Sequence, residues 1–102
     1  MFGLWVLRRL SRMTEQEILK KAVEKFGTEA QLRQLQEECA ELIVAVNHYL
    51  RMKTNGMNNL MEEVVDVKIM IKQIECSFGS LGERIRDVYE EEKLKRLEEM
   101  VK

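Results

Sequence analysis

The chain has no proline anywhere in its 102 residues, and this absence is the strongest constraint on its fold. Proline ends helices and marks turns, so a chain without it can run in long uninterrupted helices. Glu, Lys, Leu and Met, which favour helices, are frequent, and no alternating strand pattern competes. The sequence therefore predicts an all-α protein made of a single domain.

Four capping boxes, in which Ser, Thr or Asn is followed three residues later by Glu or Gln, mark the predicted helix starts. They are Thr14 with Glu17, Thr28 with Gln31, Asn59 with Glu62, and Ser80 with Glu83. Gly27, Gly56 and Gly79 lie where the preceding helices are expected to end. A loop is expected at 53–58. The expected helices cover residues 15–26, 29–53, 60–78 and 81–101.

Residues 1–12 differ from the rest, because an apolar run is followed by Arg8, Arg9 and Arg12. A secretory signal has the opposite order, with its positive charge before the apolar core, and this run is too short to span a bilayer. We interpret 1–12 as an N-terminal extension and 13–102 as the functional domain. The extension is either an addition before a start at the methionine that follows it, a helical arm that packs on a partner, or a segment on a membrane surface.

The charge balance and the cysteines exclude several classes of function. The formal net charge of −1 gives no basic field for nucleic acid. Cys39 and Cys76 lie in apolar helical patterns, as reduced core thiols of a cytoplasmic protein do. The one histidine, His48, supports neither an ordinary structural zinc site nor a Ser-His-Asp or Cys-His mechanism. We expect a cytoplasmic protein that binds neither nucleic acid nor membrane.

Two pairs of acidic residues stand out on helical wheels. Glu63 and Asp66 form a narrow stripe between two apolar bands of the third expected helix, and Glu38 and Glu41 do the same on the second. A helix built only for stability would place its carboxylates on the solvent face. Members of each pair are three residues apart and share a face. A short connection makes the two helices antiparallel neighbours, so the pairs are expected to meet.

A group of four partly buried carboxylates needs compensation for its charge. An all-oxygen site selects Mg²⁺, Mn²⁺ or Ca²⁺ over zinc, and Mg²⁺ commonly bridges carboxylates to substrate phosphates. The stripes therefore predict a Mg²⁺ site, with Mn²⁺ as a possible substitute, and phosphate chemistry. Either pair alone is explained equally well by a solvent-exposed helix face.

The two acidic motifs read Glu37-Glu38-Cys39-Ala40-Glu41-Leu42 and Glu62-Glu63-Val64-Val65-Asp66-Val67. Together they resemble the signature of the all-α nucleotide pyrophosphohydrolases, the MazG and dimeric dUTPase superfamily. The chain is most similar to the short, phage-type MazG-like proteins over about residues 14–100. That similarity rests on Gln31-Leu32 and Gln34-Leu35 before the first motif, and on Lys93-Leu94-Lys95-Arg96-Leu97 in the last helix.

The resemblance implies a four-helix bundle-like MazG fold, assembled as a homodimer or homotetramer. It implies Mg²⁺-dependent hydrolysis of a nucleoside triphosphate between the α and β phosphates, giving a monophosphate and pyrophosphate. The attacking water would be activated by the metal, with Glu38 or Glu41 as the base. The metal ligands that it implies are Glu38, Glu41, Glu63 and Asp66.

Four further residues are expected to contact the substrate. Lys93 and Arg96 suit polyphosphate, although neighbouring glutamates make a solvent-exposed face an equal explanation. Gln34 and Asn59 lie on the acidic stripes one turn before the acids, where sugar or base would lie, although helix capping explains Asn59 equally well. The alternatives to an enzyme are a non-catalytic helical interaction module and a nucleotide-binding regulator with slow turnover.

Overall fold

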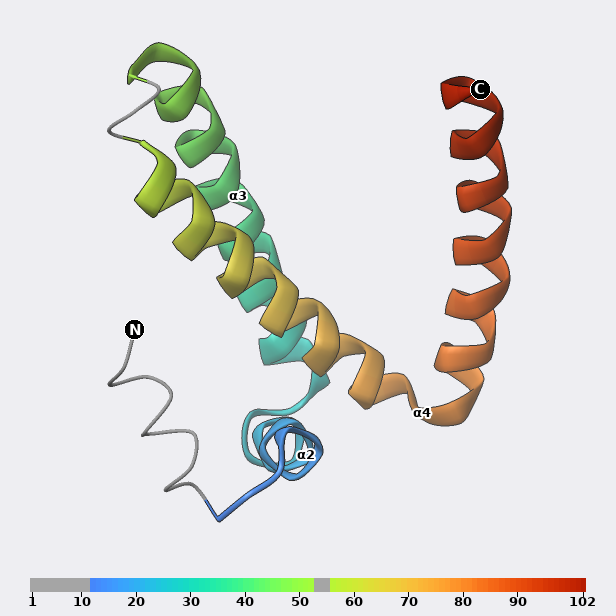
Figure 1. The fold of residues 1–102 in the computed structure, drawn as a ribbon. Coiled ribbons are helices and arrows are strands. Elements are labelled where there is room, and N and C mark those ends of the chain that lie inside the picture. Colours follow the sequence, from blue (N-terminus) through green and yellow to red (C-terminus); the bar gives the residue numbers. More distant parts are fainter. Residues whose placement is uncertain (1–11, 53–55) are drawn as a thin grey trace.

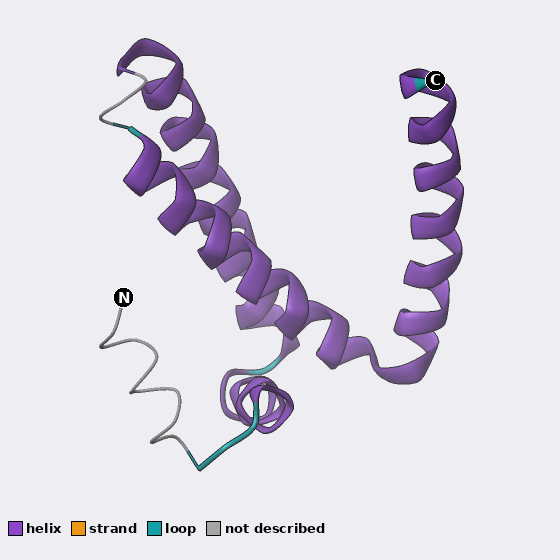
Figure 2. Cartoon of the chain, viewed as in Figure 1, coloured by secondary structure: helices purple, strands orange, loops and turns teal. Residues whose placement is uncertain are grey.

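The computed structural model describes residues 12–52 and 56–102, and almost all of them are helical (Figures 1 and 2). No strand occurs in this part of the chain, so the all-α prediction is confirmed. Apart from Arg12, which is exposed, the predicted extension 1–12 lies outside the described residues. The helices are α2 (Glu15–Phe26), α3 (Thr28–Met52) and α4 (Met57–Val101).

The first helix begins and ends as predicted. The Thr14 hydroxyl oxygen accepts a hydrogen bond from the Glu17 backbone N–H at 3.1 Å, which satisfies one of the free donors of the first turn. Gly27 ends α2 with a φ of 83°, and its N–H donates to the Val23 carbonyl at 2.9 Å. Only glycine adopts this left-handed conformation without steric cost.

The other predicted starts are less accurate. Thr28 is already the first residue of α3, so it does not cap a helix that starts one residue later. The helix α4 begins at Met57 with Gly56 as its N-cap, and Asn59 lies inside its first turn. The prediction that Asn59 caps this helix is therefore wrong. The reason is that the Gly56 carbonyl already accepts from the Leu60 N–H at 2.9 Å, which closes the first turn earlier.

The third and fourth expected helices are two arms of one bent helix. Inside α4 the backbone leaves the helical region only at Gly79, where φ is 63° and ψ is −155°. We call residues 57–78 the first arm and residues 80–101 the second arm. Gly82 supports the bend, because a Cβ atom there would lie 2.6 Å from the Phe78 Cβ. The predicted break at Gly79 is thus a sharp turn of the chain.

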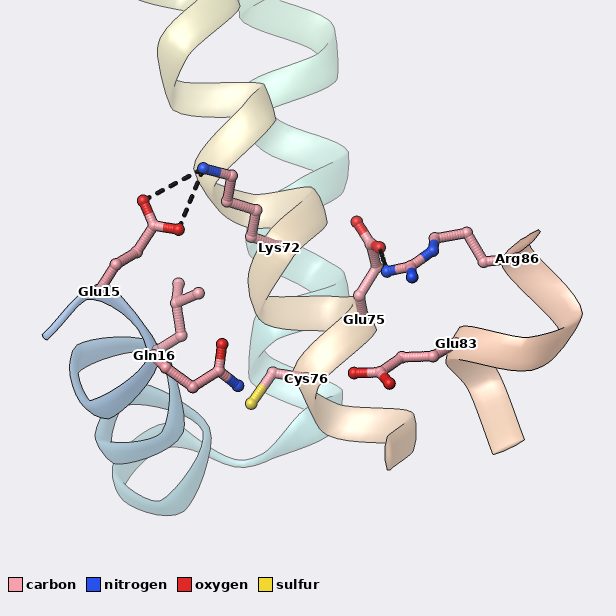
Figure 3. A pocket seen from close by; sticks show the side chains of 8 residues that line it. Glu15, Gln16, Lys72, Glu75, Cys76, Glu83 and Arg86 are labelled. Carbon is pink, nitrogen blue, oxygen red and sulfur yellow. Dashed lines mark hydrogen bonds and ion pairs between the residues drawn. The ribbon is translucent and has the colours of Figure 1, made fainter. Parts of the chain in front are cut away.

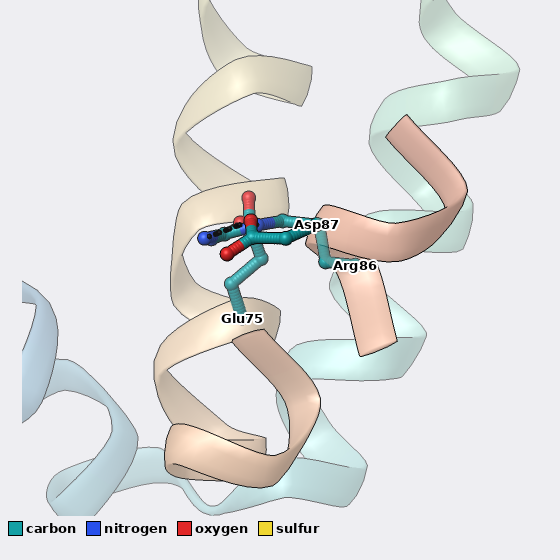
Figure 4. A network of polar contacts seen from close by, with 3 residues as sticks. All are labelled: Glu75, Arg86 and Asp87. Atoms are coloured by element: carbon teal, nitrogen blue, oxygen red, sulfur yellow. Dashed lines mark hydrogen bonds and ion pairs between the residues drawn. The ribbon is translucent and has the colours of Figure 1, made fainter. Parts of the chain in front are cut away.

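An ion-pair network spans the bend (Figure 4). The Arg86 guanidinium on the second arm donates to Glu75 on the first arm and, at 2.9 and 3.0 Å, to its neighbour Asp87. The hydrogen bonds to Glu75 and Asp87 raise the pKa of Arg86. The network is partly exposed, so its contribution to stability is small, and the glycines rather than the ion pairs determine the direction of the second arm.

The helix α3 packs antiparallel along the first arm, and α2 crosses the pair near the start of α3 (Figure 1). Lys72 on the first arm donates to Glu15 on α2 at 3.2 Å, beside a polar pocket that also contains Cys76 (Figure 3). The second arm stands apart from this hairpin (Figure 1), and residues 83–102 are all exposed. The buried apolar residues in the described parts of the chain are Leu19, Ala45, Val67 and Met70.

Among the described residues, no helix combines the length and the apolar character that crossing a membrane requires.

We predict that Gly79→Ala lowers the free energy of unfolding by about 1–3 kcal/mol, because a side chain is strained at this backbone conformation. In an unbent helix the same change would instead stabilise the protein by about 1 kcal/mol, since alanine has the higher helix propensity. Urea unfolding followed by circular dichroism measures the difference. Glu90→Ala, at an exposed position of the same arm, is the control. A stabilised Gly79→Ala protein would mean that α4 is straight.

Candidate metal centre

Three of the four predicted ligands come together in the structure. Glu38 and Glu41 on α3 and Glu63 on the first arm of α4 each place one carboxylate oxygen within 4.8 Å of the other two. The i and i+3 spacing puts the first two on one face of α3, and the antiparallel packing of α4 brings the third opposite them. We call these three residues the acid cluster.

The spacing of the oxygens suits a divalent cation. Mg²⁺ binds oxygen at about 2.0–2.1 Å, so ligands on opposite sides of the ion lie about 4.2 Å apart, and the longer bonds of Ca²⁺ allow about 5 Å. Oxygens within 4.8 Å of one another are close to the spacing that either ion requires. The donor set consists of carboxylates alone, which favours Mg²⁺, Mn²⁺ or Ca²⁺ over softer metals.

Two oxygens of the acid cluster lack a hydrogen-bond donor. Oε2 of Glu38 and Oε2 of Glu63 are buried, and neither has a partner among the described residues. A buried acceptor without a partner loses its hydration and gains nothing in return, which costs stability. A cation between α3 and α4 would supply the missing interaction, so the residues present fit the predicted metal.

The charges of the cluster act on one another. Partial burial raises the pKa of Glu63 above its ordinary value of 4.5, and the negative charges of Glu41, Asp66, Glu38 and Glu62 raise it further. Both causes disfavour the charged carboxylate. Without a metal, Glu63 therefore holds its proton more tightly than an isolated carboxylate does, as functional-site carboxylates often do.

Asp66 is the predicted ligand that stands furthest from this group. It is half-buried one turn after Glu63 and close enough to raise the pKa of Glu63. Its carboxylate does not belong to the close group found among the described residues. Its role as a fourth ligand stays a prediction.

The predicted substrate contacts divide into two groups. Gln34 lies at the site, where its Nε2 donates to Glu38 Oε1 at 2.9 Å and so fixes that carboxylate. Asn59 is exposed in the first turn of α4. Lys93 and Arg96 lie on the exposed second arm, away from the acid cluster of their own chain (Figure 1), and Arg96 pairs with Glu92 at 3.1 Å. One chain alone does not bring these two cations to the carboxylates.

Sequence reasoning did not assign Gln31 to the site: it used this residue in a capping box and in the Gln31-Leu32 segment of the family resemblance. The side chain is 3 % exposed, and its Oε1 has no partner in the described residues. It lines a cavity that adjoins the acid cluster through Gln34. The signal in the sequence was its position two turns before Glu38, on the same face of the helix.

The cysteines agree with the sequence in one respect only. Both are free thiols, as predicted. Cys76 is half-buried, but Cys39 is exposed, so the expectation that it belongs to the core is wrong for the single chain.

Comparison with known proteins adds no neighbour: no protein-family model, no curated protein and no solved structure matches this chain.

The raised pKa of Glu63 predicts how the metal-free protein responds to pH. Because the folded state holds this proton more tightly than the unfolded chain, the contribution of Glu63 to stability is largest below the ordinary value of 4.5 and is lost as the pH rises through the folded-state pKa. At neutral pH, Glu63→Gln should therefore raise the melting temperature in EDTA and flatten its pH dependence. The same variant should lose the increase in melting temperature that Mg²⁺ or Mn²⁺ gives to the wild type.

Thermal unfolding from pH 4.5 to 8, with EDTA or with each metal, measures both effects. Glu37→Gln removes an exposed carboxylate next to the cluster and should leave both unchanged. An equal response of the two variants to metal would exclude a specific role for Glu63.

Proposed function

We propose that this protein is a Mg²⁺-dependent nucleoside triphosphate pyrophosphohydrolase that produces a nucleoside monophosphate and pyrophosphate. The observation that carries the proposal is the convergence of Glu38, Glu41 and Glu63, from two helices, with two buried oxygens that have no donor among the described residues. Such a group is unfavourable as a purely structural feature and suits a divalent cation with bound phosphates. The resemblance of the two acidic motifs to the MazG-like enzymes supports the same reaction.

The environments of the acidic residues suggest separate tasks. Glu38, held by Gln34, and Glu63, half-buried opposite it, are suited to hold the metal, with Asp66 beside them. Glu41 is the exposed member of the cluster, and no side-chain hydrogen bond holds it among the described residues. We therefore assign to Glu41 the role of the base that accepts a proton from the attacking water. When bound, Mg²⁺ neutralises phosphate oxygens and lowers the pKa of that water.

A homo-oligomer is part of the proposal, because one chain leaves too much apolar surface uncovered. On the second arm, Leu81, Val88 and Met100 are 67 %, 64 % and 80 % exposed. Surfaces of this kind are normally covered by another protein surface. The first and second arms each span about 33 Å, so an arm can lie along the full length of the α3–α4 hairpin of another copy.

The pattern of the second arm supports burial on two sides. Its first half exposes Leu81, Ile85 and Val88, and its second half exposes Leu94, Leu97 and Val101. At 100° per residue these two groups lie on nearly opposite faces of the helix. A single neighbouring helix covers only one of them. An assembly in which the arm lies between helices would cover both and complete the four-helix arrangement that the resemblance implies.

The same exposed arm supports the alternative, a non-catalytic helical interaction module. In that case the second arm would bind a partner, and the acid cluster would serve metal-dependent stability alone. Binding of nucleotides separates the two functions, because the interaction module has no use for a triphosphate. A nucleotide-binding regulator would bind nucleotide with Mg²⁺ and release no product.

The activity is tested directly with a panel of ribo- and deoxyribonucleoside triphosphates, with and without Mg²⁺. We expect monophosphate and pyrophosphate, formed only with the metal. Glu41→Gln is expected to lower kcat by at least about 100-fold, because the base is lost, while Mg²⁺ still raises the melting temperature. Asp66→Asn is expected to lower the activity as well.

Glu37→Gln is the matched control, since it removes an exposed carboxylate from the same turn of α3 and should retain wild-type activity. Release of orthophosphate instead of pyrophosphate would contradict the proposed bond cleavage. Full Mg²⁺-dependent turnover by Glu41→Gln would remove this residue from the mechanism.

The assembly predicts that Lys93 and Arg96 act on the acid cluster of another copy. The double variant Lys93→Ala/Arg96→Ala should raise KM for nucleotide by about tenfold or more, because charge-assisted contacts to phosphate are lost. Mixed with Glu41→Gln protein after joint refolding, it should regain activity in hybrid sites that contain one intact copy of each part. No recovery, in oligomers whose mixing is verified by mass spectrometry, would show that both parts act within one chain or that the cations are not used.

A further inference from the structure

A cavity of about 340 Å³ lies where α2, the start of α3 and the first arm of α4 meet, near the crossing seen in Figure 1. Its walls are largely apolar but include three side-chain amides. The lining residues are Phe26, Ala30, Gln31, Gln34, Met70 and Gln73. Among the cavities of the described residues, it is notable for adjoining the acid cluster, because Gln34 lines it and also donates to Glu38.

Gln31 lines this cavity, and its side-chain oxygen is a buried acceptor without a partner among the described residues. Its side chain is 3 % exposed, and its Nε2 donates to the Ala22 carbonyl on α2 at 3.3 Å. That bond sets the orientation of the amide, so the atom without a partner in residues 12–52 and 56–102 is the oxygen, Oε1. A buried carbonyl oxygen without a donor is uncommon in folded proteins, and a ligand with an N–H group would satisfy it.

The distance from the cavity to the acid cluster suits a nucleotide. Gln31 precedes Glu38 by two turns on α3, and Met70 follows Glu63 by two turns on α4, which is about 10 Å along each helix. The cavity and the carboxylates are thus separated by a similar length on both helices. The base and the phosphates of an extended nucleotide are separated by a comparable span.

Phe26 adds a surface for an aromatic ligand. It ends α2 at the rim of the cavity and is 60 % exposed. Aromatic side chains at such rims stack on nucleobases of any type, whereas hydrogen bonds at the base edge discriminate among them. Phe26 and Gln31 therefore provide a stacking surface and a specific acceptor at the same cavity.

We propose that this cavity binds the base of the substrate, and that Gln31 Oε1 accepts a hydrogen bond from an N–H group on the edge of that base. The inference rests on the proposed function and adds the substrate class. The preferred substrates are nucleoside triphosphates whose base presents an amino or imino N–H, and inorganic triphosphate, which has no base, is used poorly.

The test compares each nucleotide with an analogue that lacks one N–H donor. Suitable pairs are UTP with N3-methyl-UTP, CTP with the 2-pyrimidinone nucleotide, and ATP with the purine riboside nucleotide. For the best substrate, we expect the analogue to lower kcat/KM by about tenfold or more in the wild type. In Gln31→Leu the difference should fall below about threefold, because the acceptor is gone. Gln36→Leu, at an exposed position of the same helix, should retain the full difference.

A second variant tests the cavity in case Gln31→Leu disturbs the fold. Ala30 lines the cavity from an exposed position, so Ala30→Leu narrows the cavity without removing a buried polar group. It should raise KM for nucleotides. Inhibition by inorganic triphosphate, measured in the presence of Mg²⁺, should stay unchanged. Ala40→Leu, at an exposed position of α3 outside the cavity lining, should change neither.

The possible failures can be distinguished. If the wild type cleaves nucleotides with the same kcat/KM for both members of each pair, the cavity does not bind the base specifically, and the pyrophosphohydrolase function still stands. If Ala30→Leu weakens the binding of inorganic triphosphate as much as the binding of nucleotide, the variant acts on the acid cluster, and the proposed base site is rejected. If neither nucleotides nor inorganic triphosphate bind with Mg²⁺, both proposals fall.

Discussion

The packing of α3 against the first arm of α4 is the interaction on which the rest of the structure depends. Ala45 on α3 and Val67 and Met70 on α4 are buried, and this packing brings Glu38, Glu41 and Glu63 together against their mutual repulsion. The cost is visible in the raised pKa of Glu63 and in two buried oxygens that have no donor in the described part of the chain. Hydrophobic burial thus offsets the repulsion among these carboxylates, which a bound divalent cation would reduce.

The bend at Gly79 has the second-largest consequence, because it directs about a quarter of the described residues away from the hairpin. The hairpin with α2 buries only a small apolar core, and the second arm buries none of its own large apolar residues. A chain of this size gains stability mainly from buried apolar area. Assembly between copies is therefore the natural completion of this fold, and it would also bring the cations of the second arm towards a carboxylate site.

Gln34 links the two parts of the proposed site. It fixes one carboxylate of the acid cluster and forms part of the wall of the cavity that Gln31 lines. The cluster has the chemistry for phosphates, and the cavity has the chemistry for a base. Because both lie on α3 and the first arm, their separation is set by two rigid helices rather than by a loop, which favours a defined distance between them.

The sequence by itself determined the features that depend on neighbouring residues. Helical periodicity placed the carboxylates on shared stripes. The capping box at Thr14 defined the start of α2, and glycines defined the end of α2 and the bend in α4. Only the tertiary structure decided what depends on contacts between distant segments. It brought three carboxylate oxygens within 4.8 Å while leaving Asp66 outside the close group, and it joined two expected helices into one bent helix. It also buried the side-chain carbonyl of Gln31 with no donor from the described residues. Helical periodicity specifies which face a side chain occupies, but the exact distance across two packed helices and the burial of a single atom follow from how side chains from both helices and α2 fill the space between them.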